Sequence, residues 1–252
     1  REKFKVFFTW NTNPLASAPE QNRLRQNLER KDLFIIACDV FMTDTASYAD
    51  IVLPAASFLE YDDLTFSYFH YYLGAQTKIS NPMGESLPNA EIFRRLAKRM
   101  KLEEDCLFES DKSLIDAMMK QTGMDLDFED LKCRGYSYIS EDVLMPYSDH
   151  VFETPSGKIE IASAEAEKMG LPRTPKPWVD EIDDPDSWRL LTPASLWRMN
   201  DSYANDPKIA EKAGVANVHM NPLDAALLEV SNGSSVEIFN DCGSIELIVS
   251  LD

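Results

Sequence analysis

The residues best suited to bind a ligand lie in one stretch, 33–56, whose sequence is LFIIACDVFMTDTASYADIVLPAA. Six apolar residues, 33–38, come directly before Asp39, and a polar loop then leads to a second apolar run that begins at Ile51. An unbroken apolar run bounded by turn residues is typical of a strand buried on both faces, as in parallel sheets. Ligands of open α/β sheets bind outside the carboxyl ends of the strands. Asp39 could therefore face ribose or base donors, although an Asp here more often only caps a turn. Three hydroxyl groups follow it in the loop and could face the same ligand, those of Thr43, Thr45 and Ser47.

A strand, a turn and a helix precede this stretch and would position a second polar loop beside it. Residues 5–10, KVFFTW, have the apolar and aromatic character of a strand, and the turn residues NTNP follow directly. Ser17 is predicted to open a helix, with Glu20 completing a capping box. The order strand, helix, strand predicts a parallel βαβ unit. Such a unit places Asn13 and Asp39 at the same edge of the sheet.

The residues after a third strand at 51–53 are rich in aromatic side chains and poor in helical periodicity. Glu60 and Tyr61 lie soon after that strand, within reach of the same edge. Residues 89–101 follow a proline, carry an apolar stripe at helical spacing and predict a helix whose N-terminus lies near the edge. Four aromatic residues could form a stacking surface for a base, although such residues more often pack in a core or an interface; they are Tyr68, Phe69, Tyr71 and Tyr72.

The middle of the chain predicts short elements that end in a linker. Short helices are expected at 113–121 and 128–132, and a hairpin is expected at 152–163. The proline-rich stretch 171–177 is typical of an extended linker. We therefore place a domain boundary near 175–187.

Beyond the linker the sequence predicts β structure. We expect strands at 188–192, 235–239 and 244–251, and a short helix that begins at Pro222. These strands are too few to close a barrel. The chain also begins within strand-like residues and stops after an edge strand that has no predicted neighbour, which indicates a fragment of a longer protein.

The 252-residue chain has an ordinary globular composition, with 44% hydrophobic and 27% charged residues. Its net charge of −18 argues against nucleic acid and anionic membranes as partners, because both would repel it. No apolar run approaches the length of a membrane span. The four cysteines and three histidines lack the spacing of a metal or cluster site, so we assign no metal ligand and expect each cysteine to be a buried thiol.

Seven short stretches of the chain form a recognisable set. They are NP at 13–14, DVFMTDTASYADIVLPAASFLE at 39–60, PMGES at 82–86, TPSGKIE at 154–160, LLTP at 190–193, NDSYAND at 200–206 and NPLDAALLEVSNGSSVEIFNDCG at 221–243. Together and in this order they resemble the molybdopterin oxidoreductases of the dimethyl sulfoxide reductase family. Each stretch is weak alone, but seven in register are hard to obtain by accident.

The resemblance implies an α/β fold in which a Rossmann-like parallel-sheet domain is followed by part of a double-psi β-barrel domain. It divides the chain into a nucleotide-binding part at 1–105, connecting helices, hairpin and linker at 106–180, and an incomplete barrel that binds molybdopterin dinucleotide at 181–252. Enzymes of this family bind two molybdopterin guanine dinucleotides around one molybdenum or tungsten atom. The resemblance therefore implies this cofactor.

The resemblance also implies which residues hold the cofactor. Asn13, Asp39 and Thr43 match contacts to one guanosine end, and two weaker matches replace residues that are commonly charged in the family, at Tyr61 and Asn89. The barrel loop would hold the pterin and its phosphates, through Thr192, Ala194, Ser195, Arg198 and Asn200. Arg198 can pair with a pyrophosphate as a charged fork. This loop lacks the histidine that several branches of the family carry.

The function implied by the resemblance is that of the C-terminal part of an oxidoreductase that transfers an oxygen atom or a hydride equivalent at the metal. The metal ligand and any iron–sulfur cysteines would lie outside these 252 residues, so the chain alone is expected to be inactive. Electron-transfer subunits are the expected protein partners. The expected compartment is the cytoplasm or periplasm of a bacterium or archaeon, with the cytoplasm slightly favoured.

Two other functions fit parts of the sequence. A cofactor-free docking or scaffold subunit derived from the same fold is the alternative, but such a subunit has no need of Asn13, Asp39, Thr43 and Arg198. A free-standing flavodoxin-like nucleotide binder is disfavoured, because the chain lacks a glycine-rich phosphate loop and carries the barrel segment.

Overall fold

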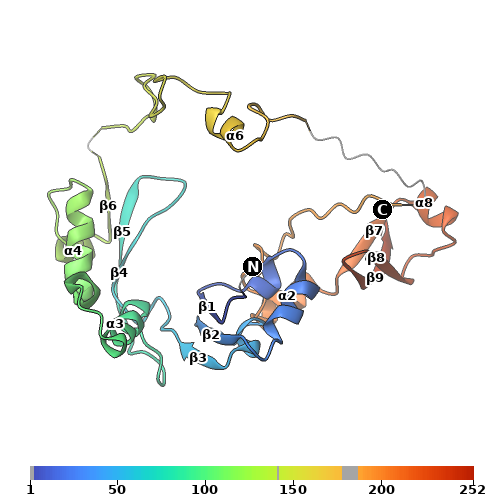
Figure 1. Cartoon of the computed structure of the whole chain (residues 1–252), viewed down its shortest axis with the longest axis horizontal. Helices are drawn as coiled ribbons and strands as arrows, with labels where there is room; N and C mark the ends of the chain where they lie inside the picture. The colour runs from blue at the N-terminus through green and yellow to red at the C-terminus, as the bar shows by residue number, and fades with distance from the viewer. Residues whose placement is uncertain (1–2, 141, 178–186) are drawn as a thin grey trace. The chain divides into compact units, whose positions relative to one another are not determined.

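The structure is a computed structural model that describes residues 3–140, 142–177 and 187–252 (Figure 1). The chain forms two compact units. The first unit comprises Arg1–Asp63, Gln76–Leu114 and Pro193–Asp252, and the second comprises Leu64–Ala75 and Ile115–Thr192. Each unit is described by itself below.

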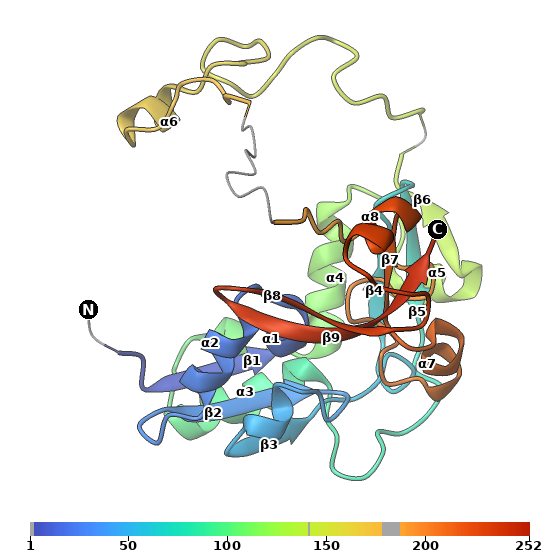
Figure 2. The same ribbon diagram turned by 90° about the vertical axis from the view of Figure 1, so that its right-hand side faces the viewer.

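A parallel three-stranded sheet organises the first unit, as predicted (Figure 2). Its strands are β1 (Val6–Trp10), β2 (Phe34–Asp39) and β3 (Ile51–Pro54), in the order β1-β2-β3. Trp10 pairs with Cys38, and Cys38 pairs with Leu53. All three strands therefore end at one edge of the sheet, which we call the carboxyl edge.

Helices cover both faces of this sheet. The short helices α1 (Pro14–Ser17) and α2 (Gln21–Leu28) supply Leu15 and Leu28, which pack with Ile35 of β2. Helix α3 (Asn89–Met100) supplies Ile92, which packs with Cys38 of β2 and with Ala55. Residues three apart in a strand point to opposite faces. The expectation that the apolar run of β2 is buried on both faces is therefore confirmed.

The predicted start of the first helix is wrong. Ser17 is the last residue of α1, and its hydroxyl donates a hydrogen bond back to the carbonyl of Asn13 at 3.0 Å. Helix α2 begins separately at Gln21, and the side chain of Glu20 makes no capping hydrogen bond. The physical reason is Pro19, because the residue before a proline is driven out of the helical region. Ala18 is accordingly extended and separates the two helices.

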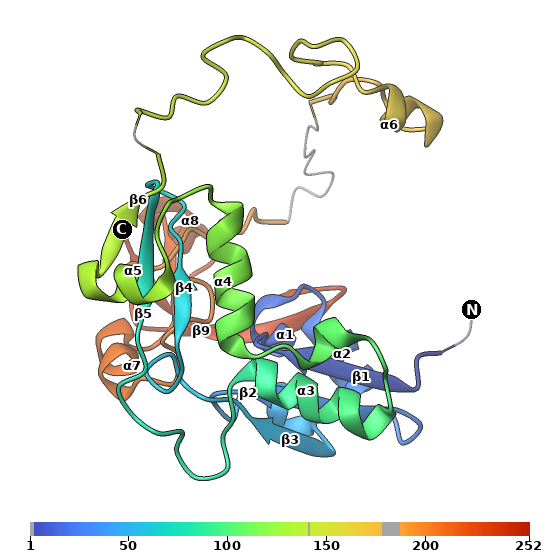
Figure 3. The same cartoon turned by 90° about the vertical axis from the view of Figure 1, so that its left-hand side faces the viewer.

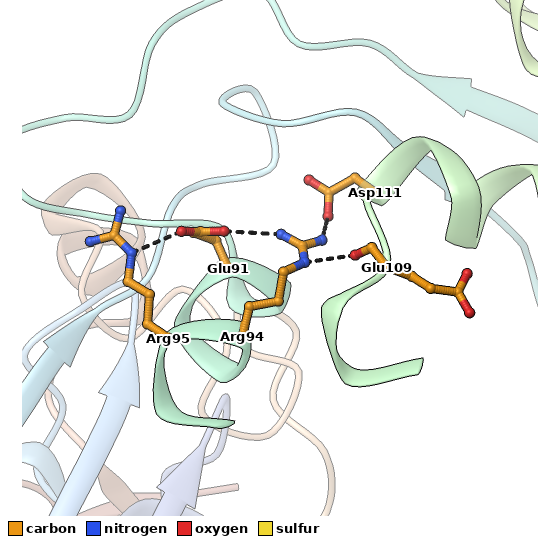
Figure 4. Close-up of polar contacts among 5 residues, drawn as sticks. All are labelled: Glu91, Arg94, Arg95, Glu109 and Asp111. Atoms are coloured by element: carbon orange, nitrogen blue, oxygen red, sulfur yellow. Dashed lines mark hydrogen bonds and ion pairs between the residues drawn. The ribbon is translucent and has the colours of Figure 1, made fainter. Parts of the chain in front are cut away.

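An arginine cluster joins α3 to the segment after it, which contains the 3₁₀ helix η2 (Asp105–Phe108) (Figure 4). Arg94 donates from Nε to the carbonyl of Glu109 at 2.8 Å and from Nη1 to Glu91 at 3.1 Å, and it also pairs with Asp111. Glu91 accepts a second bond from Arg95 at 2.8 Å. Hydrogen bonds from Arg95 and then Arg94 lower the pKa of Glu91. The side chain of Arg94 is only 18% exposed, so this cluster is partly buried.

A second sheet, of strands β4 (Asp63–Thr65), β5 (Tyr72–Gln76) and β6 (Tyr136–Tyr138), organises the second unit (Figure 3). The apolar residues Leu64 and Leu73 of this sheet pack against helices α4 (Asp111–Gln121) and α5 (Phe128–Arg134). These two helices match the predicted ones to within two residues at each end. The strands were not predicted, because β6 lies some sixty positions after β5 and only this distant pairing reveals them.

The segment 142–177 contains one helix, α6 (Ala164–Lys168), and the predicted hairpin at 152–163 is wrong. These residues form a turn without flanking strands. Gly157 donates its N–H to the carbonyl of Thr154 at 3.0 Å, and the hydroxyl of Thr154 donates to the carbonyl of Lys158 at 2.7 Å. Side-chain contacts within the turn satisfy the backbone groups that a ladder would have used. Most of the predicted domain boundary, 175–187, lies outside the described residues.

After the linker, the structure differs from the prediction at 188–192 and agrees with it from Pro222 onward. The predicted strand at 188–192 is wrong, because these residues are irregular and exposed. The predicted hairpin is confirmed as β8 (Ser235–Asn240) and β9 (Gly243–Leu251), and Asn240 Oδ1 accepts from the N–H of Cys242 in the turn. Helix α8 (Pro222–Leu227) begins at the predicted residue.

Two further elements of this part were not predicted, helix α7 (Pro207–Ala213) and strand β7 (Asn217–Met220). Strand β7 pairs in parallel with β9, so the described sheet has the order β7-β9-β8. Its completion as a double-psi barrel stays a prediction. None of the described helices combines the length and the apolar character that a membrane span requires.

Candidate functional site

Three loops follow the strands of the parallel sheet and meet at its carboxyl edge. The N–H of Asn11, in the first loop, donates to the carbonyl of Cys38 at 3.0 Å, which continues the pairing of β1 with β2. The N–H of Ala55, in the third loop, donates to the carbonyl of Asp39 at 3.0 Å. The backbone therefore holds the loops after β1, β2 and β3 side by side. This arrangement is the one that the βαβ prediction requires.

Asn13 and Thr45 join the first loop to the second. Asn13 Oδ1 accepts from the hydroxyl of Thr45 at 2.8 Å and from the N–H of Thr45 at 3.2 Å. The same hydroxyl oxygen accepts from the N–H of Leu15 at 3.1 Å. Thr45 has no exposed surface. The expectation that its hydroxyl faces a ligand is therefore wrong, because that hydroxyl is used inside the protein.

Asp39 and Thr43 lie in the second loop and are partly exposed. Asp39 Oδ1 accepts from the N–H of Phe41 at 3.2 Å, so the carboxylate caps a turn. Its second oxygen, Oδ2, makes no hydrogen bond to the described residues. Thr43 Oγ1 accepts from the N–H of Ala46 at 3.1 Å, at the start of the 3₁₀ helix η1 (Ala46–Tyr48). The turn-capping alternative is thus correct for Asp39, and one oxygen still remains for a ligand.

Glu60 fixes the third loop and was only partly recognised in the sequence. The residue is 9% exposed, and its carboxylate accepts from the N–H groups of Ser57 at 2.7 Å and Met83 at 2.8 Å. These bonds tie the loop after β3 to the segment that leads into α3. Tyr61 follows immediately and is partly exposed. Glu60 therefore positions the backbone from which the Tyr61 side chain projects.

Replacing Glu60 with Gln should destabilise the protein by about 1–3 kcal/mol, the usual cost of a buried polar group without its partner. Both carboxylate oxygens accept from backbone N–H groups, so the amide nitrogen of Gln would face one of those donors. The midpoint of urea unfolding measures this loss. Glu85→Gln is the control, because Glu85 is exposed in the same region. An equal effect of both substitutions would contradict the assigned role of Glu60.

Asn89 is the first residue of α3 and lies under the carboxyl end of β2. Its Oδ1 accepts from the thiol of Cys38 at 3.7 Å. Cys38 is buried, and this burial, followed by the charge of Asp39, raises the pKa of the thiol. The other cysteines are exposed, so the expectation of buried thiols is wrong for Cys106, Cys133 and Cys242. The described residues contain no cluster of histidine, cysteine and acidic side chains that could hold a metal ion.

The residues predicted to hold the pterin lie in an exposed, irregular segment. Ser195 Oγ accepts from the N–H of Trp197 at 3.2 Å, and Asn200 has a positive φ of 56°. Arg198 makes no ion pair with the described residues. Thr192 belongs to the second unit, whereas Ala194, Ser195, Arg198 and Asn200 belong to the first.

The structure therefore joins some of the predicted site residues and not others. Hydrogen bonds connect the loops of Asn13, Asp39 and Thr43, and Asn89 contacts β2 beside Asp39. Within the described part of the chain, no hydrogen bond connects Arg198 to this group. The convergence of the two groups on one ligand stays a proposal.

The aromatic residues of the second unit divide into two kinds. Tyr68 and Phe69 are fully exposed, with 101% and 94% of their reference surface, so they are not core residues. Tyr72 instead packs edge-on against Tyr136 and Tyr138, with ring centroids 5.4 and 5.2 Å apart. Residues of this sheet, Tyr72 among them, and of the loop between β4 and β5 line a shallow hollow of about 500 Å³. Nothing in it identifies a nucleotide base as its ligand.

Comparison with known proteins gives matches at both ends of the chain. A family model described as "Molybdopterin oxidoreductase" matches residues 1–99. A second model, described as "Molydopterin dinucleotide binding domain", matches residues 188–252. The first match contains all three loops of the carboxyl edge, and the second contains the segment around Arg198.

Curated relatives match nearly the whole chain. "Probable oxidoreductase YoaE" of Bacillus subtilis (strain 168) is 32% identical over 252 residues, which cover 98% of this chain and 37% of that protein. "Acetylene hydratase" of Syntrophotalea acetylenica is 31% identical over 262 residues, which cover 98% of this chain and 35% of that protein. The chain thus spans little more than a third of the length of these relatives.

A solved structure supports the fold. "Acetylene Hydratase from Pelobacter acetylenicus" superposes with a TM-score of 0.77 at 23% identity, over 98% of this chain and 35% of that chain. This likeness shows that the mixed α/β arrangement with its parallel sheet is shared with that protein.

Proposed function

The chain belongs to the molybdopterin oxidoreductases, and from this membership we propose that it forms part of the cradle for a bis-molybdopterin guanine dinucleotide cofactor. The observation that carries the proposal is the carboxyl edge, where Asn13, Asp39 and Thr43 come from loops that hydrogen bonds hold together. Ligands of open α/β sheets bind at such an edge.

The residues at this edge have the chemistry that a guanosine requires. Asp39 Oδ2 can accept from the N–H groups of guanine or from ribose hydroxyls. The Asn13 amide can donate to a carbonyl, ribose or phosphate oxygen. We assign Tyr61 and Asn89 to the borders of the same guanosine site. In a chain of net charge −18, an anionic ligand must be held by placed groups of this kind.

The segment around Arg198 is proposed to bind the pterin and the phosphates. Arg198 is exposed and makes no ion pair with the described residues, so its guanidinium can donate two parallel hydrogen bonds to a pyrophosphate as a bidentate donor. Thr192, Ser195 and Asn200 can add hydroxyl and amide hydrogen bonds, and Ala194 leaves room for the pterin. The role of these residues is to bind and orient the cofactor.

When bound, the cofactor supplies two-electron chemistry at molybdenum or tungsten, as oxygen-atom or hydride-equivalent transfer. We place the metal ligand, the substrate funnel and any iron–sulfur cluster outside these 252 residues, because the chain spans little more than a third of its relatives. Relatives that match over nine tenths of the chain are named as a dimethyl sulfoxide reductase, an acetylene hydratase and a formate dehydrogenase. Their diversity supports a cofactor assignment and no particular substrate. Electron-transfer subunits are proposed partners.

The test is to purify the full-length protein that contains these 252 residues from cells supplied with molybdate or tungstate and to extract it with acid. We expect an oxidised, fluorescent pterin together with GMP, in a ratio of two nucleotides to one metal atom. A folded, metal-supplied protein that releases neither compound would contradict the proposal. That outcome would favour the cofactor-free docking subunit as the function.

A further inference from the structure

We propose that Thr45 is a positioning residue that makes Asn13 a pure hydrogen-bond donor toward the ligand. This inference rests on the proposed function, because it concerns how the same carboxyl edge recognises its nucleotide. It adds a residue that the ligand does not touch.

The hydrogen bonds around Asn13 allow only one orientation of its amide. A backbone N–H can only donate, so the Asn13 atom 3.2 Å from the N–H of Thr45 must be the oxygen, Oδ1. The hydroxyl oxygen of Thr45 accepts from the N–H of Leu15 at 3.1 Å. Its own proton is then donated to Asn13 Oδ1 at 2.8 Å. Each donor and acceptor in this chain of bonds is thereby assigned.

The consequence is that the Asn13 oxygen is saturated from inside the protein. A carbonyl oxygen has two lone pairs, and Thr45 occupies both with its hydroxyl and its N–H. The amide nitrogen of Asn13 makes no hydrogen bond to the described residues, and the side chain is partly exposed. Asn13 can therefore offer two N–H donors to a ligand and no acceptor.

This arrangement selects the chemistry of the ligand group. The group that meets Asn13 must be an acceptor, such as a carbonyl, ribose or phosphate oxygen. An amide free to rotate by half a turn would accept amino groups equally well. Because Thr45 has no exposed surface and bonds to both Asn13 and Leu15, it removes that freedom before the ligand binds.

The experiment compares Thr45→Val, Thr45→Ser and Asn13→Asp in the protein purified from molybdate-supplied cells. GMP released by acid is measured per protein, before and after prolonged dialysis, together with the melting temperature. Thr45→Val keeps the N–H bond to Asn13 Oδ1 but removes the hydroxyl bond and frees one lone pair, so it should speed the loss of nucleotide about tenfold, the usual effect of one hydrogen bond to a polar or charged group. Thr45→Ser should behave like the wild type, because it keeps the hydroxyl.

Asn13→Asp keeps both acceptor contacts to Thr45 but presents no donors to the ligand. It should lose nucleotide like Thr45→Val while retaining the wild-type melting temperature. Equal retention of nucleotide by Asn13→Asp and the wild type would overturn the inference.

A double-substitution cycle separates positioning from a general loosening of the loops. If Thr45 acts through Asn13, Thr45→Val should cause no further nucleotide loss in an Asn13→Ala background. Fully additive losses would overturn the inference. A wild-type protein that releases no GMP at all would instead contradict the proposed function, so the two failures are distinguishable.

Discussion

Replacing Asp39 with Asn should strip guanine nucleotide from the protein without unfolding it. Asn keeps an oxygen that can accept from the N–H of Phe41, which Asp39 Oδ1 does at 3.2 Å, so the turn is retained. The second oxygen becomes an amide nitrogen, which donates where guanine and ribose also donate. We expect nucleotide affinity to fall about 10- to 100-fold, the effect of losing a hydrogen bond to a charged group and placing donor against donor.

The measurement is acid-released GMP per protein, with the melting temperature recorded in parallel. Asp44→Asn is the matched control, because it removes the same charge from an exposed position in the same loop. A general effect of charge on an acidic protein would appear in both variants. If Asp39→Asn retains as much nucleotide as Asp44→Asn, then Asp39 only caps its turn and does not bind the ligand.

Replacing Arg94 with Met should produce a large loss of stability. Arg94 is 18% exposed and connects α3 to residues Glu109 and Asp111 beyond η2. Met keeps an unbranched apolar side chain in place of the arginine stem but leaves these acceptors without their donor. We expect a loss of about 2 kcal/mol, since hydrogen bonds to charged groups are worth about 1.5–3 kcal/mol.

Arg95→Met is the control for this substitution. Arg95 is the next residue, its side chain is 64% exposed, and among the described residues it bonds to Glu91 alone, so its loss should cost no more than about 0.5 kcal/mol. Urea unfolding at neutral pH compares the two variants. Equal midpoints for Arg94→Met and Arg95→Met would show that the cluster contributes nothing beyond an exposed ion pair.

The same cluster predicts the direction of acid sensitivity. The pKa of Glu91 is lowered by its bonds to Arg95 and Arg94, so its stabilising effect is complete above the unfolded value of about 4.3. That effect is lost as the pH falls through the lowered value. In Glu91→Gln, the free energy of unfolding, measured with urea at a series of acidic pH values, should therefore fall less steeply with decreasing pH than in the wild type.

The parallel sheet and α3 could be predicted from the sequence because the pattern that indicates each element lies within its own residues. The apolar run that ends at Asp39 and the stripe from Ile92 onward each reveal burial within one element. The strands β4, β5 and β6 lack such a signal. Tyr72 pairs with Tyr138, and only the folded chain brings these two residues together. The opposite error occurred at 188–192. Their composition is typical of a strand, but in the structure these exposed residues pair with no other strand.

Sequence patterns alone indicated the family resemblance, the parallel order of the first three strands and the polar character of the loops at their ends. What each polar side chain does in those loops depends on the folded structure. The buried Thr45 hydroxyl donates to Asn13, and Glu60 accepts from the N–H of Met83. One oxygen of Asp39 caps a turn, and the other makes no hydrogen bond to the described residues. The physical reason is that a loop side chain has no periodic pattern to orient it. Its direction depends on donors and acceptors supplied by residues distant in the sequence.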